Sequence, residues 1–529
     1  MKRWILAGAT ALALVGGQAE AKTFKWAYQG DIQSLDPQGL QETFTLGFLG
    51  NVYEALTHYD TNLKLEPALA TSWENTDPTH WVFHLREGVT FHNGDPFTAD
   101  DVIFTWKRSL TPGSDLKGAG GKMSEIEKID DHTIKVTTPT PNPILPRDLP
   151  FFYIMSHKWA AENNATQATS PAEANSSSTY ASTHENGTGP FIVTGRQPDV
   201  KTTFKRFDGY WDKDLKTNVD EVAFTPISED ATRTAALISG DLDLVFPVPV
   251  QDWQRLEDAK GVKPLHGPDA RTIFLGMDQF RDELLYSDVK GKNPLKDKDV
   301  RGAIAHAIDL KAIDEKVMRG AANPAGLLIG PQINGFSKDL AEPYAYDPKQ
   351  SKELLDKAGY PDGFQLGMDC PNNRYVNDEL VCRAVASYLA KIGIKVDLNA
   401  QPKAKYFAKV GPQNGNDTSF YLLGWTPTTF DAQNTLFNIV HSFDKAANAG
   451  QFNYGHYSNT AIDDMITQID KETDEAKRQS LIDEAFKTLK DDYGILPIHQ
   501  QPLSWGVKDT IDAPQRPDDV LDFRYVTMP

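Results

Sequence analysis

Strand-like and helix-like patterns alternate along most of this chain, and that alternation constrains its fold more than any single motif. Residues 22–29 and 79–85 alternate large apolar and polar side chains, as half-buried strands do. Two short strands are expected at 366–368 and 395–398. Helical spacing of apolar residues recurs at 99–109, 229–239, 298–319, 347–358, 377–392 and over most of 459–492. This order, without internal repeats, predicts an α/β fold with a partly parallel sheet covered by helices.

Length and charge limit the possible domain number and partners. The chain has 529 residues, whereas single hydrophobic cores stop growing at roughly 250–300 residues, so two or three domains are expected. Its 54 Lys and Arg residues stand against 73 Asp and Glu residues, a formal charge of −19. Nucleic-acid binding needs a basic face, and adhesion to an anionic membrane needs basic clusters. The acidic balance argues against both.

The N-terminus has the pattern of a secretory signal. Lys2 and Arg3 precede an apolar stretch from Trp4 to Val15, and Ala19-Glu20-Ala21 supplies a small-residue cleavage site, so residues 1–21 are predicted to be removed. The alternative, a membrane anchor, requires about 20 apolar residues, more than this stretch has. No Cys follows the apolar stretch, so no lipid anchor is expected. The sequence predicts an exported, soluble protein.

The chain has two cysteines, Cys370 and Cys382. Because an exported protein meets an oxidising compartment, a disulfide between them is expected, with two unpaired buried thiols as the alternative. Neither cysteine has nearby histidines that could complete a zinc site.

Several short motifs follow one another in an order that resembles a known family. They are Glu66–Trp73, Trp81–Gly94, Phe97–Val102, Gly187–Phe191, Tyr210-Trp211, Leu237–Asp243, Val300–Asp309 and Ala358–Tyr360. Together they resemble the solute-binding proteins of family 5, the extracytoplasmic receptors of peptide and nickel ABC importers. The resemblance covers essentially the whole chain after residue 21.

This resemblance implies a type II periplasmic-binding-protein fold of the cluster C type, with two lobes around a hinge cleft and an extra inserted domain. Lobe I would comprise residues 22–58, 188–270 and 498–529, the inserted domain 59–187, and lobe III 271–497. It also implies a monomer in the periplasm that captures a small organic solute and delivers it to a membrane permease. Contact with the membrane would be peripheral, through that complex.

The resemblance places ligand contacts at the end of a Gly-Trp strand, which here gives Trp425, Thr426, Thr428 and Asp431 as candidates. Peptide-binding relatives have an Asp at the position of Thr428, where it holds the ligand ammonium. A hydroxyl cannot replace that charge. Asp431 is either a contact or a brace for the turn.

A second departure concerns the Arg that dipeptide-binding relatives place near Cys370, which this chain lacks. Arg374 could bind an anionic group instead, or form a salt bridge to Asp378. Asn372, Tyr28 and Phe44 are further candidates, the last two from lobe I. With both peptide anchors altered, a peptide-like or other polar organic solute is expected rather than an ordinary dipeptide. An oligosaccharide or a sugar- or opine-type conjugate is the alternative.

An exported hydrolase is the rival class. The sequence has no G-x-S-x-G, H-E-x-x-H, P-loop or C-x-x-C motif. Carboxylate pairs such as Asp100/Asp101 are adjacent rather than facing. His80 and His84 share a strand, which separates them by about 13 Å, too far to share a metal. No catalytic residue, cofactor or metal is predicted.

Overall fold

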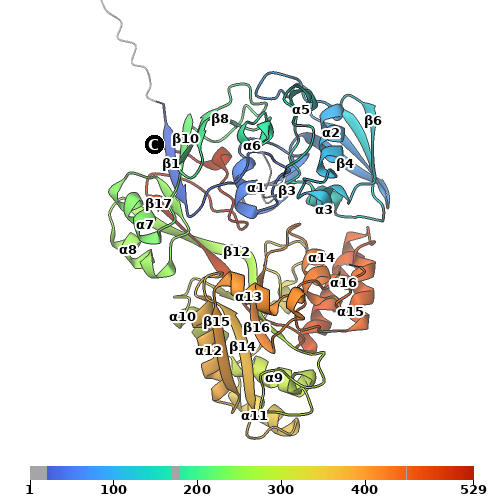
Figure 1. The fold of residues 1–529 in the computed structure, drawn as a ribbon, viewed down its shortest axis with the longest axis vertical. Helices are drawn as coiled ribbons and strands as arrows, with labels where there is room; N and C mark the ends of the chain where they lie inside the picture. Colours follow the sequence, from blue (N-terminus) through green and yellow to red (C-terminus); the bar gives the residue numbers. More distant parts are fainter. Residues whose placement is uncertain (1–20, 170–178, 448) are drawn as a thin grey trace, which may run out of the picture.

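The computed structural model describes residues 21–169, 179–447 and 449–529 (Figure 1). The predicted cleavage site lies largely outside these ranges. A mixed sheet of 11 strands connects the two halves of the molecule. Its order is β15 (Lys395–Gln401), β14 (Gln365–Pro371), β16 (Phe420–Trp425), β12 (Val262–Met277), β17 (Leu496–Lys508), β11 (Leu244–Phe246), β1 (Thr23–Tyr28), β10 (Glu221–Pro226), β9 (Lys201–Arg206) and β8 (Phe191–Gln197), with β13 (Asn323–Pro324) paired to β17.

The sheet is partly parallel, as the sequence predicts. β1 runs parallel to β10 and β11, and β14 runs parallel to β15 and β16. The two longest strands, β12 and β17, are antiparallel and pass from the upper to the lower half of the molecule in Figure 1. Their pairing shifts register between Pro268 and Thr272. Such an irregularity bends a strand and re-aims its side chains.

Two smaller sheets lie in the segment predicted as an inserted domain or at its start, since β2 begins two residues before residue 59. One has the order β4 (Ala70–Asp77), β5 (His80–Leu85), β7 (Thr133–Thr137) and β6 (Glu125–Asp130), and the other pairs β2 (Thr57–Tyr59) with β3 (Leu65–Pro67). The helices here are α2 (Ala99–Ser109), α3 (Lys117–Gly120), α4 (Leu145–Asp148), α5 (His157–Glu162) and α6 (Tyr180–Thr183).

Helices flank both ends of the large sheet. Those packed with β1 and its neighbours are α1 (Thr43–Leu49), α7 (Asp230–Ser239) and α8 (Trp253–Asp258). The other end carries α9 (Lys298–Ala307), α10 (Leu310–Lys316), α11 (Pro348–Lys357), α12 (Asp378–Ala390), α13 (Lys403–Val410), α14 (Ala432–Thr435), α15 (Thr460–Ile469) and α16 (Glu475–Asp491). Within the described ranges, no helix combines the length and apolarity needed to cross a bilayer.

The single helix predicted over 298–319 is wrong. The chain leaves the helix after Ala307 and starts α10 at Leu310, because the Asp309 side chain accepts a hydrogen bond from the Ala312 N–H at 2.9 Å. An Asp side chain that binds the backbone in this way favours a helix start over a helix interior.

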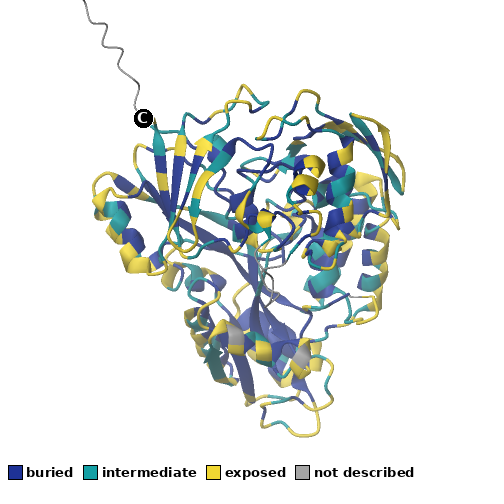
Figure 2. Cartoon of the chain, turned by 45° about the horizontal axis from the view of Figure 1, so that its top comes forward, coloured by how far each residue is buried: buried dark blue, intermediate teal, exposed yellow. Residues whose placement is uncertain are grey.

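Separate apolar clusters support the division into three units, which stays our proposal. One cluster lies entirely between Leu56 and Ile154, another surrounds Trp26 and Trp505, and two more lie within the proposed lobe III. A few residues cross the proposed boundaries. Tyr59, Leu63 and Ala270 pack into one lobe III cluster, Ile498 packs into the other, and Tyr153 packs into the cluster around Trp26 and Trp505. Figure 2 shows the buried central strands between these regions. The proposed boundaries at 270 and 498 fall inside β12 and β17, so these strands would form the hinge.

Candidate functional site

A cavity of about 650 Å³ lies where β12 and β17 cross between the two halves of the sheet. Its walls come from both proposed lobes. They comprise Tyr28, Gln29, Glu42–Phe44, Asp230, Pro247–Gln251, Asp269, Arg271, Asn372–Leu380, Thr426, Gln501–Ser504, Asp518 and Asp519. Five of the predicted contacts are among them, namely Tyr28, Phe44, Asn372, Arg374 and Thr426, whereas Trp425, Thr428 and Asp431 are not.

Two stacked aromatic rings form the lobe I wall. Tyr28 is the last residue of β1 and Phe44 lies in the first turn of α1, which the Glu42 carboxylate caps. The ring centroids are 3.8 Å apart and the ring planes differ by 12°. Burial, and then the charge of Asp519, raise the pKa of Tyr28 to about 12. The phenol is therefore neutral at physiological pH and can donate a hydrogen bond to a ligand.

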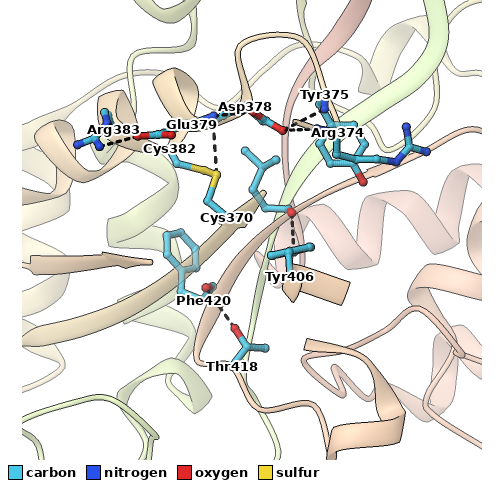
Figure 3. Close-up of a disulfide and its surroundings, with 11 residues drawn as sticks. Cys370, Arg374, Tyr375, Asp378, Glu379, Cys382, Arg383, Tyr406, Thr418 and Phe420 are labelled. Carbon is cyan, nitrogen blue, oxygen red and sulfur yellow. Dashed lines mark hydrogen bonds and ion pairs between the residues drawn. A yellow bond between two sulfur atoms is a disulfide. The ribbon is translucent and has the colours of Figure 1, made fainter. Parts of the chain in front are cut away.

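Arg374 lies in the turn between β14 and α12. The Asp378 carboxylate holds this turn by accepting hydrogen bonds from the backbone N–H groups of Arg374 and Tyr375 at 2.9 and 3.0 Å (Figure 3). The Arg374 guanidinium is exposed, with its carbon 5.1 Å from the Tyr375 ring centroid. It has no hydrogen bond or ion pair with any described residue, so the salt bridge to Asp378 that the sequence allows is not formed.

A disulfide joins Cys370 to Cys382 directly beneath this turn, with a Cα–Cα distance of 6.6 Å (Figure 3). This is the pairing that the sequence predicts. It ties the end of β14 to α12, and both cysteines are fully buried. The cross-link therefore restricts the segment from which Arg374 enters the cavity.

Sequence reasoning missed a charged cluster where the hinge strands meet the C-terminal segment. Asp269 and Arg271 lie in the irregular part of β12, and Asp519 lies near the C-terminus. Asp269 accepts hydrogen bonds from the Arg271 backbone N–H at 2.9 Å and from Gln501 Nε2 at 3.1 Å. Asp519 Oδ1 accepts one from Trp505 Nε1 at 2.8 Å.

Burial is the main cause of the altered pKa values in this cluster. It raises the pKa of Asp269, against the opposing charge of Arg271. It also raises the pKa of Asp519 to about 7, where the Trp505 hydrogen bond opposes the shift and the charge of Asp269 adds to it. The charged Asp-Ala-Arg stretch just before the buried end of β12 was the available signal for Asp269 and Arg271. The sequence around Asp519 gives no comparable signal.

Trp425 and Thr428 belong to a neighbouring network. The Trp425 ring lies 4.7 Å from the Phe452 ring centroid, and its Nε1 donates to Asn434 Oδ1 at 3.1 Å. Asn434 Nδ2 in turn donates to Thr428 Oγ1 at 3.1 Å. Thr426, the residue between them, lines the cavity, and its hydroxyl is buried without a hydrogen-bond partner among the described residues. Of these three residues, Thr426 alone lines the cavity, and neighbouring atoms cover its hydroxyl oxygen.

Asp431 is fully buried and has the geometry of a brace. Its two oxygens accept hydrogen bonds from Arg478 Nη1 and Nη2 at 3.0 and 2.7 Å, and one of them also accepts from Asn334 Nδ2 at 2.6 Å. The other caps α14 through the Gln433 N–H. Of the two roles that the sequence allows, the structure favours the brace, because no oxygen of Asp431 faces the cavity.

Comparison with known proteins gives matches over most of the chain. The family model described as bacterial extracellular solute-binding proteins, family 5 Middle, matches residues 64–447. The glutathione-binding protein GsiB of Shigella dysenteriae is 28% identical over 468 residues, which are 87% of this chain and 85% of that protein. GsiB of Pectobacterium atrosepticum is 27% identical over 492 residues, which are 92% and 90% of the two chains.

Solved structures resemble the whole fold. Helicobacter pylori DppA, in complex with the peptide STSA, is 24% identical with a TM-score of 0.72, and the match covers 96% of this chain and 98% of that one. Listeria monocytogenes CtaP has a TM-score of 0.82 at 21% identity, over 96% and 100%. AgaA of A. tumefaciens R10, in complex with agropinic acid, has a TM-score of 0.70 at 25% identity, over 96% and 99%.

Proposed function

We propose a ligand class and a cellular setting for this chain, which belongs to the bacterial extracellular solute-binding proteins of family 5 and has the type II periplasmic-binding-protein fold. The proteins of this family are binding proteins, so the chain is a solute receptor of the kind that serves ABC importers. We propose that its solute is a short peptide or a peptide-like compound with charged ends.

The observation that carries this proposal is the cavity between the hinge strands. Its volume of about 650 Å³ lies within the roughly 300–1,000 Å³ typical of small-molecule sites. Stacked rings offer apolar surface, while the Arg374 guanidinium has no hydrogen-bond or ion-pair partner among the described residues. Contacts from both lobes to one solute would favour the closed form, because a ligand shifts a conformational equilibrium by its differential affinity for the two states.

The ligands of two relatives agree with this class. Glutathione is a modified tripeptide, and the H. pylori protein was solved with a tetrapeptide. Thr428 and Cys370 replace the charged anchors of dipeptide-binding relatives, so the charges that this chain uses must lie elsewhere in the cavity. The cavity lining has two arginines, Arg271 and Arg374, and several carboxylates, among them Asp269 and Asp519.

The proposed setting is the periplasm. Export would use residues 1–21 as a cleaved signal, the mature protein would carry no lipid anchor, and it would act as a monomer that docks on a membrane permease. Its encounter with that permease would be its sole contact with the membrane.

A thermal-shift screen followed by calorimetry tests the function. The mature chain from residue 22 is mixed with glutathione, short peptides, opines, oligosaccharides and divalent metals. A true ligand at 100 times its dissociation constant stabilises the fold by about 2.7 kcal/mol. We expect glutathione or short peptides to raise the melting temperature and to be recovered intact. Cleavage of a bound compound would identify the protein as a hydrolase. If no compound from these classes binds, the proposed receptor function is refuted.

A further inference from the structure

The hairpin formed by β2 and β3 packs into lobe III, outside the ligand cavity. Tyr59 and Leu63 are buried in an apolar cluster of lobe III, and Leu65 packs against the same cluster. The Tyr59 hydroxyl donates a hydrogen bond to the Thr429 carbonyl oxygen at 2.9 Å. The Tyr59 ring meets the Phe430 ring edge to face, with the centroids 5.0 Å apart. The hairpin therefore contacts the loop between β16 and α14.

Both sides of this contact contain a non-glycine residue with a left-handed backbone. Leu63, at the tip of the hairpin, has a φ of 61°, and Phe430 has a φ of 47°. The Asp60 side chain supports the tip by accepting hydrogen bonds from the N–H groups of Asn62 and Lys64, both at 2.8 Å. Bulky residues persist in this region only where their surroundings hold them. Here Leu63 and Phe430 are each 3% exposed and share one cluster, so the strain indicates that the contact has a function.

The base of the hairpin is bonded to the inserted domain, so the hairpin cannot follow lobe III on its own. The Thr57 hydroxyl donates to the Pro146 carbonyl oxygen at 2.8 Å. The Tyr59 hydroxyl also lies 3.2 Å from the Arg147 carbonyl oxygen. Leu56, directly before β2, belongs to the apolar core of the inserted domain. A separation of the inserted domain from lobe III would therefore pull the hairpin out of its contact.

Buried bonds join the inserted domain to lobe I. Nη1 and Nη2 of Arg108, in α2, donate to the two carboxylate oxygens of Asp36 at 2.8 and 2.6 Å, and both side chains are 0% exposed. The Tyr153 hydroxyl donates to the Leu46 carbonyl oxygen at 2.8 Å. Because separating a buried ion pair is costly, we expect lobe I and the inserted domain to move as one body about the hinge strands.

We propose that the β2–β3 hairpin is a latch between this body and lobe III. Tyr59 and Leu63 dock beside Phe430 when the cleft closes and leave lobe III when it opens. The inference rests on the proposed function and adds a determinant of ligand affinity that does not contact the ligand, since the cavity lining given above includes none of these three residues. The docked latch stabilises the closed form, so it should slow the release of ligand.

Thiol labelling tests whether the latch opens. The chain's two cysteines form the Cys370–Cys382 disulfide, so Leu63→Cys has a single free thiol. Asn62→Cys, at the exposed neighbouring position, is the matched control. In the ligand-free protein, we expect Leu63→Cys to react with a maleimide within about tenfold of the control rate. Saturating S-methylglutathione, which lacks a free thiol, or the peptide STSA should slow Leu63→Cys at least about tenfold and leave Asn62→Cys unchanged.

Calorimetry and urea denaturation test whether the latch sets affinity. Tyr59→Phe should lose about 3- to 10-fold in affinity for these two compounds, and Leu63→Gly about 10- to 100-fold. Neither variant should lower the urea midpoint of the ligand-free protein, because its hairpin is undocked and glycine adopts a left-handed φ without strain. Tyr153→Phe is the matched control, since it loses an equally buried hydroxyl bond within the lobe I body. Its midpoint should fall while its affinity stays within about threefold of the wild type.

The outcomes separate the latch from the proposed function. If Tyr59→Phe and Leu63→Gly lower the midpoint of the ligand-free protein but bind like the wild type, the contact is a permanent part of the fold. The latch is then overturned while the receptor function stands. Labelling of Leu63→Cys that is equally slow with and without ligand, or equally fast, also overturns it. If neither compound binds the wild type, the proposed ligand class fails, whereas the ligand-free labelling rate still decides whether the hairpin opens.

Discussion

Removing the Asp431 carboxylate should destabilise the fold without a direct effect on ligand contacts. The Asp431 side chain is 0% exposed and that of Arg478 8% exposed, and the two share two hydrogen bonds. In Asp431→Ala, the Arg478 guanidinium keeps only its Nε bond to the Ile469 carbonyl, at 3.2 Å. Breaking a buried ion pair from one side costs about 3–5 kcal/mol, because the other charge is left uncompensated. That is the loss of unfolding free energy we expect.

Urea denaturation of the wild type and the variant measures this loss from the transition midpoints at unchanged slope. A double variant with Arg478→Met removes the stranded charge and should recover about 2 kcal/mol of the loss. Calorimetry should use the peptide that binds the wild type best. We expect its affinity for folded Asp431→Ala to lie within about threefold of its affinity for the wild type. A variant that unfolds within about 1 kcal/mol of the wild type but fails to bind would refute the brace and make Asp431 a ligand contact.

Three further changes have defined outcomes. Trp425→Ala should lower the free energy of unfolding by about 2 kcal/mol, since the half-buried ring packs on Phe452. A loss of ligand affinity with an unchanged melting temperature would instead identify Trp425 as a ligand contact. Replacing Cys370 and Cys382 by Ser should cost about 3 kcal/mol in non-reducing denaturation, whereas equal midpoints would show that the cross-link is not formed. Folding raises the pKa of Asp519 from 3.8 to about 7, so the native state holds this proton more tightly than the unfolded state does. At pH 8 the carboxyl is ionised, and this lowers the free energy of unfolding by at most about 4 kcal/mol. Asp519→Asn should match the stability of the wild type near pH 4 and exceed it at pH 8. The other titratable or charged groups that face Asp519 are Asp269, Asp518, Arg271 and Tyr28. An equal stability difference at both pH values would show that titration of Asp519 is not its cause.

The sequence predicted those parts of the molecule that depend on local pattern. The alternation at 22–29 gave β1, and Pro348 and Gly359 correctly bounded α11. The break between α9 and α10 was missed because the Asp309 cap interrupts a continuous apolar pattern. Tyr28 ends β1, Arg374 follows β14 and both line the cavity, since the ends of parallel strands bring side chains to one edge of a sheet. Their contact with a ligand stays a prediction.

The presence of both Asp269 and Asp519 in the cavity wall could not be predicted, because the two residues are distant in sequence and lie in unlike structures. Asp269 lies inside a 16-residue strand whose apolar residues indicate core. Its exposure to the cavity depends on the register shift against β17, which is a property of strand pairing and not of β12 alone. Asp519 has a left-handed φ of 61° in a segment without regular structure. Two such positions meet only once the whole sheet has formed.

The hinge strands also connect the turn that carries Arg374 to the buried Asp269. Gln501 of β17 accepts a hydrogen bond from the Val376 N–H at 3.1 Å, in the turn that carries Arg374. Its amide donates to Asp269 of β12 at 3.1 Å. Any movement of the Arg374 turn relative to Asp269 must therefore strain or exchange these two bonds. A solute that contacts both the Arg374 turn and β12 would thus act on the hinge itself and not only on the outer walls of the cleft.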